Sequence, residues 1–92
     1  MSTAGVYILK SQRNGRYYIG STIDVARRLE EHNHGKVKAT RYIQPLILKA
    51  FIPCIDIASA RQAEYRLKQY KRTDIIEQVI KQVLFPWNYK DI

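Results

Sequence analysis

The stretch GVYILKSQRNGRYYIG, residues 5–20, constrains the fold of this chain more than any other segment. Its two ends, residues 5–10 and 16–21, alternate in character and are rich in Val, Ile and Tyr, which predicts two β-strands. Asn14-Gly15 between them is a strong hairpin signal, because both residues tolerate the positive φ of a type I′ turn. The segment therefore predicts a β-hairpin near the N-terminus.

The position of the turn decides which residues face each other across this hairpin. A two-residue turn at Asn14-Gly15 places Tyr7 opposite Thr22 and Tyr18 opposite Ser11. Side chains alternate between the two faces of a strand, so Tyr7 and Tyr18 are expected on the same face. Any other even-length loop preserves this parity, whereas an odd loop or a bulge breaks it.

A helix and a third strand are predicted after the hairpin. Asp24 is suited to cap a helix over residues 25–33, with Gly35 as the residue that ends it. Residues 45–52, PLILKAFI, begin at one proline and stop before another, which favours a strand.

Two helices complete the expected fold. Ser59 and Gln62 form a capping-box pattern for a helix over residues 60–71, and Thr73 or Asp74 begins the next helix. The apolar face expected for the last helix comprises Ile75, Ile76, Val79, Ile80, Val83 and Leu84. The order ββαβαα predicts an α+β fold in which a small, mainly antiparallel three-stranded sheet packs with about three helices.

Composition limits the class of partner. The 92 residues suffice for a single domain, 1–92, and sixteen Lys and Arg against eight Asp and Glu give a net charge of +8. Such a balance favours polyanions, nucleic acid first. No segment has the ~20 apolar residues of a membrane helix, so no membrane association is expected. The single Cys54 predicts a reduced core thiol in a cytoplasmic protein.

Arg28 and His32 lie at helical spacing from Val25 and Leu29, on an otherwise apolar stripe. Arg28 could lay its stem on the core with its head in water, or form a fork for phosphate oxygens. His32 could be a packed or capping histidine, or a hydrogen-bonding or proton-transfer group in a site.

Glu64 lies beside the small inward residues Ala60 and Ala63 of its predicted helix. It could pair with Lys68 one turn later on a solvated face. It could instead be a magnesium ligand, because Mg²⁺ accepts one carboxylate together with waters and substrate phosphate. The segment GKVKATRY, residues 35–42, adds Lys36, Lys38 and Arg41, which could follow a nucleic-acid backbone or belong to a solvated loop.

Taken together, these positions resemble the GIY-YIG nuclease superfamily, in its small stand-alone bacterial-type branch. The matching residues are Gly5-Val6-Tyr7, Tyr18-Ile19-Gly20, Arg28, His32 and Glu64. The segment EHNHGK, residues 31–36, and the tail PWNYKDI are also similar to those of small members. Val6 replaces the isoleucine that is usual in the family.

The resemblance implies metal-dependent hydrolysis of phosphodiester bonds in DNA. Tyr7 would orient or deprotonate the attacking water, and Tyr18 would hold the scissile phosphate or support Tyr7. Arg28 would stabilise phosphate charge and His32 would hydrogen-bond in the same site. Glu64 would bind Mg²⁺ or Mn²⁺, and Asn88 is a candidate for the supporting asparagine of some members.

The chain has no room for a separate recognition domain, so the resemblance implies structure-selective cutting, low sequence specificity, or a protein partner that supplies the target. DNA repair or processing is the expected setting. A non-catalytic nucleic-acid-binding module of the same fold is the alternative, and backbone electrostatics alone leave RNA open as substrate. The oligomeric state stays open as well.

Overall fold

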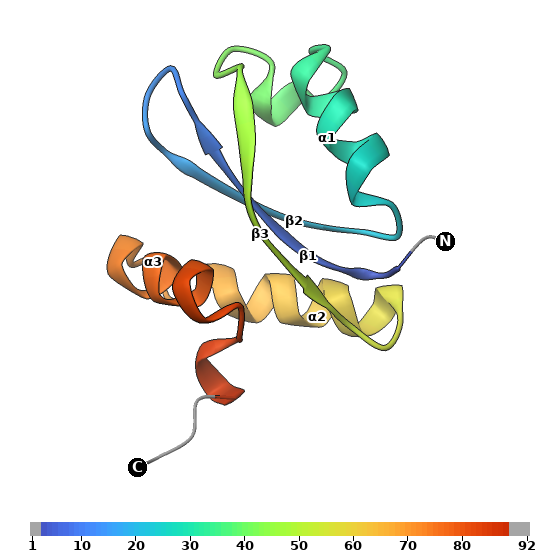
Figure 1. The fold of residues 1–92 in the computed structure, drawn as a ribbon, viewed down its shortest axis with the longest axis vertical. Coiled ribbons are helices and arrows are strands. Elements are labelled where there is room, and N and C mark those ends of the chain that lie inside the picture. Colours follow the sequence, from blue (N-terminus) through green and yellow to red (C-terminus); the bar gives the residue numbers. More distant parts are fainter. Residues whose placement is uncertain (1–2, 89–92) are drawn as a thin grey trace.

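The computed structural model describes residues 3–88 and contains a three-stranded antiparallel sheet with helices on both faces (Figure 1). The strands are β1 (Gly5–Ser11), β2 (Tyr17–Thr22) and β3 (Leu46–Pro53). The helices are α1 (Val25–Asn33), α2 (Ile57–Lys68) and α3 (Thr73–Gln82), with short 3-10 turns η1 (Lys38–Thr40) and η2 (Pro86–Asn88). The predicted α+β class and the order ββαβαα are confirmed.

The sheet order is β2-β1-β3, so β1 is the central strand and β2 is an edge strand. Tyr7 pairs with Gly20 and Leu9 with Tyr18. The expected partners, Thr22 for Tyr7 and Ser11 for Tyr18, are therefore wrong. The parity argument holds, because the true loop also has an even length, and both tyrosines belong to the same face of the sheet.

Local side-chain bonds explain the longer loop between β1 and β2. Ser11 pairs with Arg16 through a backbone hydrogen bond of 2.8 Å, so four residues form the turn. The Ser11 hydroxyl accepts hydrogen bonds from the N–H groups of Arg13 and Asn14, and Asn14 Oδ1 accepts one from the N–H of Arg16. Only Gly15 in this turn has a positive φ, 74°. Side-chain acceptors thus replace the two-residue turn that Asn14-Gly15 favours.

Two of the predicted helix starts are confirmed and one is wrong. Asp24 caps α1 by accepting a hydrogen bond from the Arg27 N–H, and α3 begins at Thr73. Helix α2 is capped by Asp56, whose carboxylate accepts from the N–H of Ser59 at 2.7 Å. It therefore starts three residues before the predicted range, because the Asp56 carboxylate reaches the Ser59 N–H and caps the helix at that point.

The ends of the last two helices also differ from expectation. Helix α2 ends at Lys68, and Lys71 has a left-handed backbone with φ 53°. Val83 is the left-handed C-cap of α3, with φ 54°. Val83 and Leu84 therefore leave the apolar face that the sequence predicted, and they are 46% and 44% exposed.

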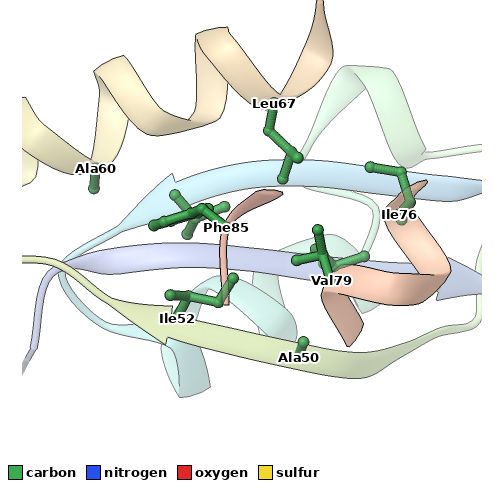
Figure 2. Packing of buried hydrophobic residues seen from close by; sticks show 9 residues of the cluster. Ala50, Ile52, Ala60, Leu67, Ile76, Val79 and Phe85 are labelled. Atoms are coloured by element: carbon green, nitrogen blue, oxygen red, sulfur yellow. The ribbon is translucent and has the colours of Figure 1, made fainter. Parts of the chain in front are cut away.

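Each face of the sheet has its own core. Between the sheet and the α2–α3 layer lie Val6, Ile8, Ala50, Ile52, Ala60, Leu67, Ile76, Val79 and Phe85. Figure 2 shows Leu67, Ile76 and Val79 meeting above the sheet, with Ala50 and Ile52 rising from β3. Cys54 packs against this core and is only half-buried, and burial raises the pKa of its thiol.

The opposite face carries a smaller core under α1. Its buried members are Tyr7, Leu9 and Leu46, with Tyr18, Val25 and Leu29 packed against them. In Figure 1, α1 covers this face while α2 and α3 cover the other. Within residues 3–88, no helix combines the length and apolar character needed to cross a bilayer.

Candidate active site

The Tyr7 hydroxyl is the centre of a buried hydrogen-bond chain that joins β1 to α1. It lies 2.8 Å from Nε2 of His32, and Nδ1 of the same ring lies 2.7 Å from the Thr40 hydroxyl. The Thr40 hydroxyl in turn donates to the carbonyl oxygen of Val37 at 3.5 Å. Tyr7 is 1% exposed, and His32 and Thr40 are fully buried. A buried histidine of this kind is held by its partners rather than by water.

The direction of this chain follows from the charge state of His32. Burial, together with the nearby positive charge of Arg28, lowers the pKa of His32 to about 4. The ring is therefore neutral near pH 7 and has one N–H and one acceptor nitrogen. Because Thr40 donates to a carbonyl, its oxygen accepts from Nδ1–H of His32. Nε2 is then the acceptor for the proton of the Tyr7 hydroxyl.

Arg28 reaches the same phenol from the solvent side of α1. Its Nε lies 3.4 Å from the Tyr7 oxygen, and its Nη1 pairs with Glu31 at 3.1 Å. The bond to Tyr7 is the main reason that the pKa of Arg28 is raised. Burial nevertheless raises the pKa of Tyr7 above its usual value, and the Arg28 bond only partly opposes this. Tyr7 is thus a neutral phenol whose oxygen already touches a cation.

Gly20 leaves the space that the Tyr7 ring occupies. The two residues are cross-strand partners, and a Cβ at Gly20 would overlap the Tyr7 hydroxyl. Tyr18 lies beside this pair, with its ring centroid 6.4 Å from that of Tyr7 and 5.0 Å from that of His32. A glycine in β2 therefore allows two tyrosines and a histidine to meet on one face.

Glu64 approaches from the other layer of the fold. It projects from α2 to the edge strand β2, where the Ser21 hydroxyl donates to its Oε1 at 2.6 Å and Lys68 pairs with its Oε2. The charge of Glu64 raises the pKa of Tyr7, although less than burial does. The Lys68 ammonium also lies 6.0 Å from the Tyr18 ring centroid, which places α2 next to the tyrosine pair.

The donor set suits a hard cation that keeps most of its waters. Among the residues that the structure describes, no cluster of three or more His, Cys, Asp or Glu side chains could hold a metal. Glu64 is a single carboxylate, 21% exposed, and Ser21 fixes one of its oxygens. Within residues 3–88, the other oxygen is bonded only by Lys68, a side chain that is itself 46% exposed. One carboxylate with an accessible oxygen fits Mg²⁺ better than it fits a metal that requires an all-protein cage.

The structure places Tyr7, Tyr18, Arg28 and His32 together, and the sequence of the chain matches a known family. The family model described as GIY-YIG catalytic domain matches residues 3–81. The chain belongs to the GIY-YIG family. The motif Gly5-Val6-Tyr7 lies on β1 and the motif Tyr18-Ile19-Gly20 lies on β2, so the two motifs belong to paired strands of one sheet.

Several relatives share most of this GIY-YIG domain. A UPF0213 protein of Xanthomonas campestris pv. campestris is 40% identical over 75 residues, which cover 80% of this chain and 74% of the relative. A UPF0213 protein of Halobacterium salinarum is 40% identical over 68 residues, covering 73% and 87%. A UPF0213 protein of Bacillus cereus is 43% identical over 60 residues, covering 64% and 62%. No solved structure matches the chain significantly.

Two polar residues that bond to members of this candidate site were not predicted from the sequence. Thr40 binds His32, and Ser21 binds Glu64. A lone threonine in a predicted loop has no spacing signal. Ser21 is an odd number of residues from Tyr18 on the same strand, so its side chain is expected on the opposite face of the sheet, which is the face that α2 covers.

The remaining predicted residues lie around the site or away from it. Lys36, Lys38 and Arg41 are exposed on the segment between α1 and β3 that also carries Thr40, and Arg41 Nε donates to the carbonyl of Gly35. Asn88 is exposed in η2, whose neighbour Phe85 belongs to the core under α2 and α3. The tail beyond Asn88 lies outside the described residues.

Proposed function

We propose that this chain is a divalent-metal-dependent endonuclease that hydrolyses phosphodiester bonds in DNA, with structure selectivity or low sequence specificity, in DNA repair or processing. The observation that carries the proposal is the bonding of one phenol oxygen, that of Tyr7, to both a neutral histidine and an arginine. A purely structural tyrosine needs one partner, and a cation is not required for packing.

Tyr7 would orient the attacking water and take its proton. A neutral phenol is a poor base, so the proton of its hydroxyl has to be received elsewhere, and Nε2 of His32 is the bonded acceptor at 2.8 Å. A phenolate formed in this way is stabilised by Arg28 and by any metal cation held nearby. Thr40 keeps the receiving nitrogen unprotonated by accepting from Nδ1–H.

Arg28 and Tyr18 would hold the scissile phosphate. The Arg28 side chain is 36% exposed and contacts the Tyr7 oxygen, so its shift toward a bound phosphate would also uncover that oxygen. A guanidinium beside the nonbridging oxygens offsets the charge that develops during in-line attack. The Tyr18 hydroxyl can add a hydrogen bond to the same group.

Glu64 would hold Mg²⁺ or Mn²⁺ after Lys68 is displaced from its outer oxygen. When bound, the metal supplies Lewis-acid stabilisation of phosphate and leaving-group oxygens. Ser21 keeps the carboxylate at the edge of β2 while the outer oxygen changes partner. Because Glu64 is the single carboxylate that we assign to the metal among the described residues, these residues support a one-metal mechanism.

The test is cleavage of single-stranded, duplex and branched DNA by the wild type and by Glu64→Gln, with Mg²⁺ or Mn²⁺ and with EDTA. We expect metal-dependent cutting of at least one substrate by the wild type and a loss of roughly a hundredfold or more in the variant, as for other groups that stabilise transition-state charge. Glu30→Gln is the matched control, because Glu30 is an exposed carboxylate on α1 and its loss changes net charge equally.

Two outcomes would reject the assignment. If the wild type binds DNA but cuts none of the substrates in the presence of metal, a non-catalytic DNA-binding module would be favoured. Equal cutting by Glu64→Gln and Glu30→Gln would show that the metal ligand lies elsewhere.

A further inference from the structure

A concavity of about 490 Å³ opens at the edge of the sheet next to the proposed site. Its apolar surface consists of Tyr17, Tyr18 and Ile19 from β2, Leu67 from α2 and Ile76 from α3. Because β2 is an edge strand, successive side chains from both of its faces border the same hollow. We call this hollow the β2-edge pocket. Its size lies in the range of pockets that hold small organic ligands.

Four cations surround this apolar floor. Arg16 directly precedes β2, Lys68 ends α2, and Lys71 and Arg72 lie in the connection to α3. Lys68 pairs with Glu64 and Arg72 with Asp74. Arg16 and Lys71 form no ion pair within residues 3–88, so the rim retains an excess of positive charge.

The backbone at Lys71 presents one of these cations in an unusual conformation. Lys71 has φ 53°, in the left-handed region that costs a side-chain-bearing residue about 1 kcal/mol or more. A glycine would fit this position without that cost. The chain thus carries a charged side chain at this left-handed position of the pocket rim.

Two residues of the pocket lining, Tyr18 and Lys68, also contact residues of the proposed active site. Tyr18 lines the pocket and also lies within 5.0 Å of the His32 ring centroid. Lys68 lines it and also binds Glu64. A nucleic-acid strand whose scissile phosphate lies at Tyr18 would therefore place its adjacent nucleotide in this pocket.

We infer that the β2-edge pocket binds one nucleotide of the substrate strand, adjacent to the scissile phosphate. The base would lie on the flat apolar and aromatic floor, and its phosphate would lie between Arg16 and Lys71. Stacking on aromatic side chains combined with a cationic rim is the recurrent chemistry of single nucleotides held by proteins. This inference rests on the proposed function for its substrate class.

The first experiment measures oligonucleotide affinity in EDTA, so that cutting is not needed for the readout. The pocket variant is Arg16→Ala with Lys71→Gly, which removes both unpaired cations and relieves the left-handed backbone. The control is Lys49→Ala with Arg61→Ala, two exposed cations on β3 and α2 that the pocket does not include. Both variants lower the net charge by two, so long-range attraction of DNA falls equally.

We expect the pocket variant to bind about tenfold more weakly than the control. The slope of log affinity against log salt concentration should also be smaller in magnitude, by roughly 0.7 for each lost phosphate contact. Equal affinity and equal salt slope in the two variants would overturn the inference. If the two variants differ in affinity as expected but the wild type cuts no DNA, only the proposed function would be rejected.

The second experiment identifies the occupant by nuclear magnetic resonance of the wild type. A 5′-phosphorylated thymidine dinucleotide should shift the backbone amides of Tyr17, Ile19 and Lys71 in a saturable way, more than inorganic phosphate at the same concentration. Equal shifts with phosphate alone would exclude a base in the pocket. Shifts with a glutamate-rich peptide but not with the dinucleotide would make the pocket a protein-docking site and overturn the inference.

Discussion

The Tyr7 hydroxyl lies 2.8 Å from Nε2 of His32, and this contact joins the central strand to α1 inside the smaller core. Both side chains are buried, so each depends on the other for hydrogen bonding. The pair is also oriented, because Thr40 occupies the other nitrogen of the ring. This hydrogen-bond chain should make stability depend on pH through His32, and it should depend on the hydroxyl of Thr40. Both effects can be measured.

The first prediction concerns stability at mildly acidic pH. His32 has a pKa of about 4 in the folded chain and 6.5 as an unperturbed group, so between these values the unfolded chain binds more protons. Its contribution to stability is complete above pH 6.5 and falls as pH is lowered toward 4. The free energy of unfolding should drop by about 2 kcal/mol between pH 7 and pH 5 from this group alone. Urea unfolding at a series of pH values measures the change.

Substitution separates His32 from other titrating groups. His32→Gln should flatten the pH dependence between pH 5 and 7, even if the variant is less stable overall. His34→Gln is the control, because His34 is exposed at the C-cap of α1. An unchanged slope in His32→Gln would mean that this histidine is not buried as a neutral ring.

The second prediction concerns Thr40, whose hydroxyl accepts from Nδ1–H of His32. Thr40→Val keeps the shape but leaves a buried N–H without an acceptor, at a cost of about 1–3 kcal/mol in stability. It also frees the ring to adopt the tautomer that cannot accept the Tyr7 proton. We expect kcat to fall by roughly tenfold to a hundredfold, the range for residues that orient a functional histidine.

Nitrogen-15 spectra of the imidazole give a readout that packing alone would not move. The wild type should show a single tautomer protonated at Nδ1, and Thr40→Val a mixture. Thr40→Ser retains the hydroxyl and should retain both the tautomer and most of the activity. A pure Nδ1 tautomer in Thr40→Val would contradict the role assigned to Thr40.

The third prediction concerns Gly20, where an added Cβ would overlap the Tyr7 hydroxyl. Gly20→Ala should therefore displace the Tyr7 ring from His32 and destabilise the fold by about 1–3 kcal/mol, as overpacking does. Gly15→Asn is the contrast, because Gly15 has φ 74° with open space around it and Asn tolerates that conformation. Thermal unfolding of both variants measures the difference, and Gly20→Ala should have the lower melting temperature. Equal melting temperatures would mean that Tyr7 moves aside without cost.

The sequence predicted the fold where local signals and periodicity agreed. Alternation defined the strands, and Asp24 marked the start of α1 correctly. The same reasoning failed where a side chain bonds to a nearby backbone N–H group. Ser11 bonds to the N–H of Arg13 in a longer hairpin loop, and Asp56 bonds to the N–H of Ser59 and so caps α2 one turn early. Such bonds depend on three-dimensional reach, which a one-dimensional pattern does not contain.

The sequence predicted that several of the candidate residues would lie on one face, but it did not predict the hydrogen bonds that join them. Parity placed Tyr7 and Tyr18 on one face, and helical spacing placed Arg28 and His32 on one stripe. The contact of His32 with Thr40 crosses an irregular segment, so no periodicity leads to it. The burial of Tyr7 to 1% was also unforeseen, because it follows from Gly20 leaving room for the ring.

The last prediction separates a catalytic from a structural role for Arg28. Its side chain is 36% exposed, and its ion pair with Glu31 lies near the surface, where such pairs contribute about 0–1 kcal/mol. Arg28→Ala should therefore lower the melting temperature by only a few degrees. The rate of DNA cleavage by this variant should fall by roughly a hundredfold to a thousandfold, because no guanidinium remains to offset the charge on the phosphate. Loss of the cation should also raise the pKa of Tyr7 further, since the Arg28 bond opposes the effect of burial.

Arg27→Ala is the matched control for this change, since Arg27 is the adjacent exposed arginine of α1 and lies off the stripe. It should cut and melt like the wild type. Arg28→Lys should recover only part of the rate, because a lysine retains the charge without the planar fork. A fall of tens of degrees in Arg28→Ala, with cutting per folded molecule unchanged, would make Arg28 a packing residue and leave Tyr7 without a catalytic partner on α1 other than His32.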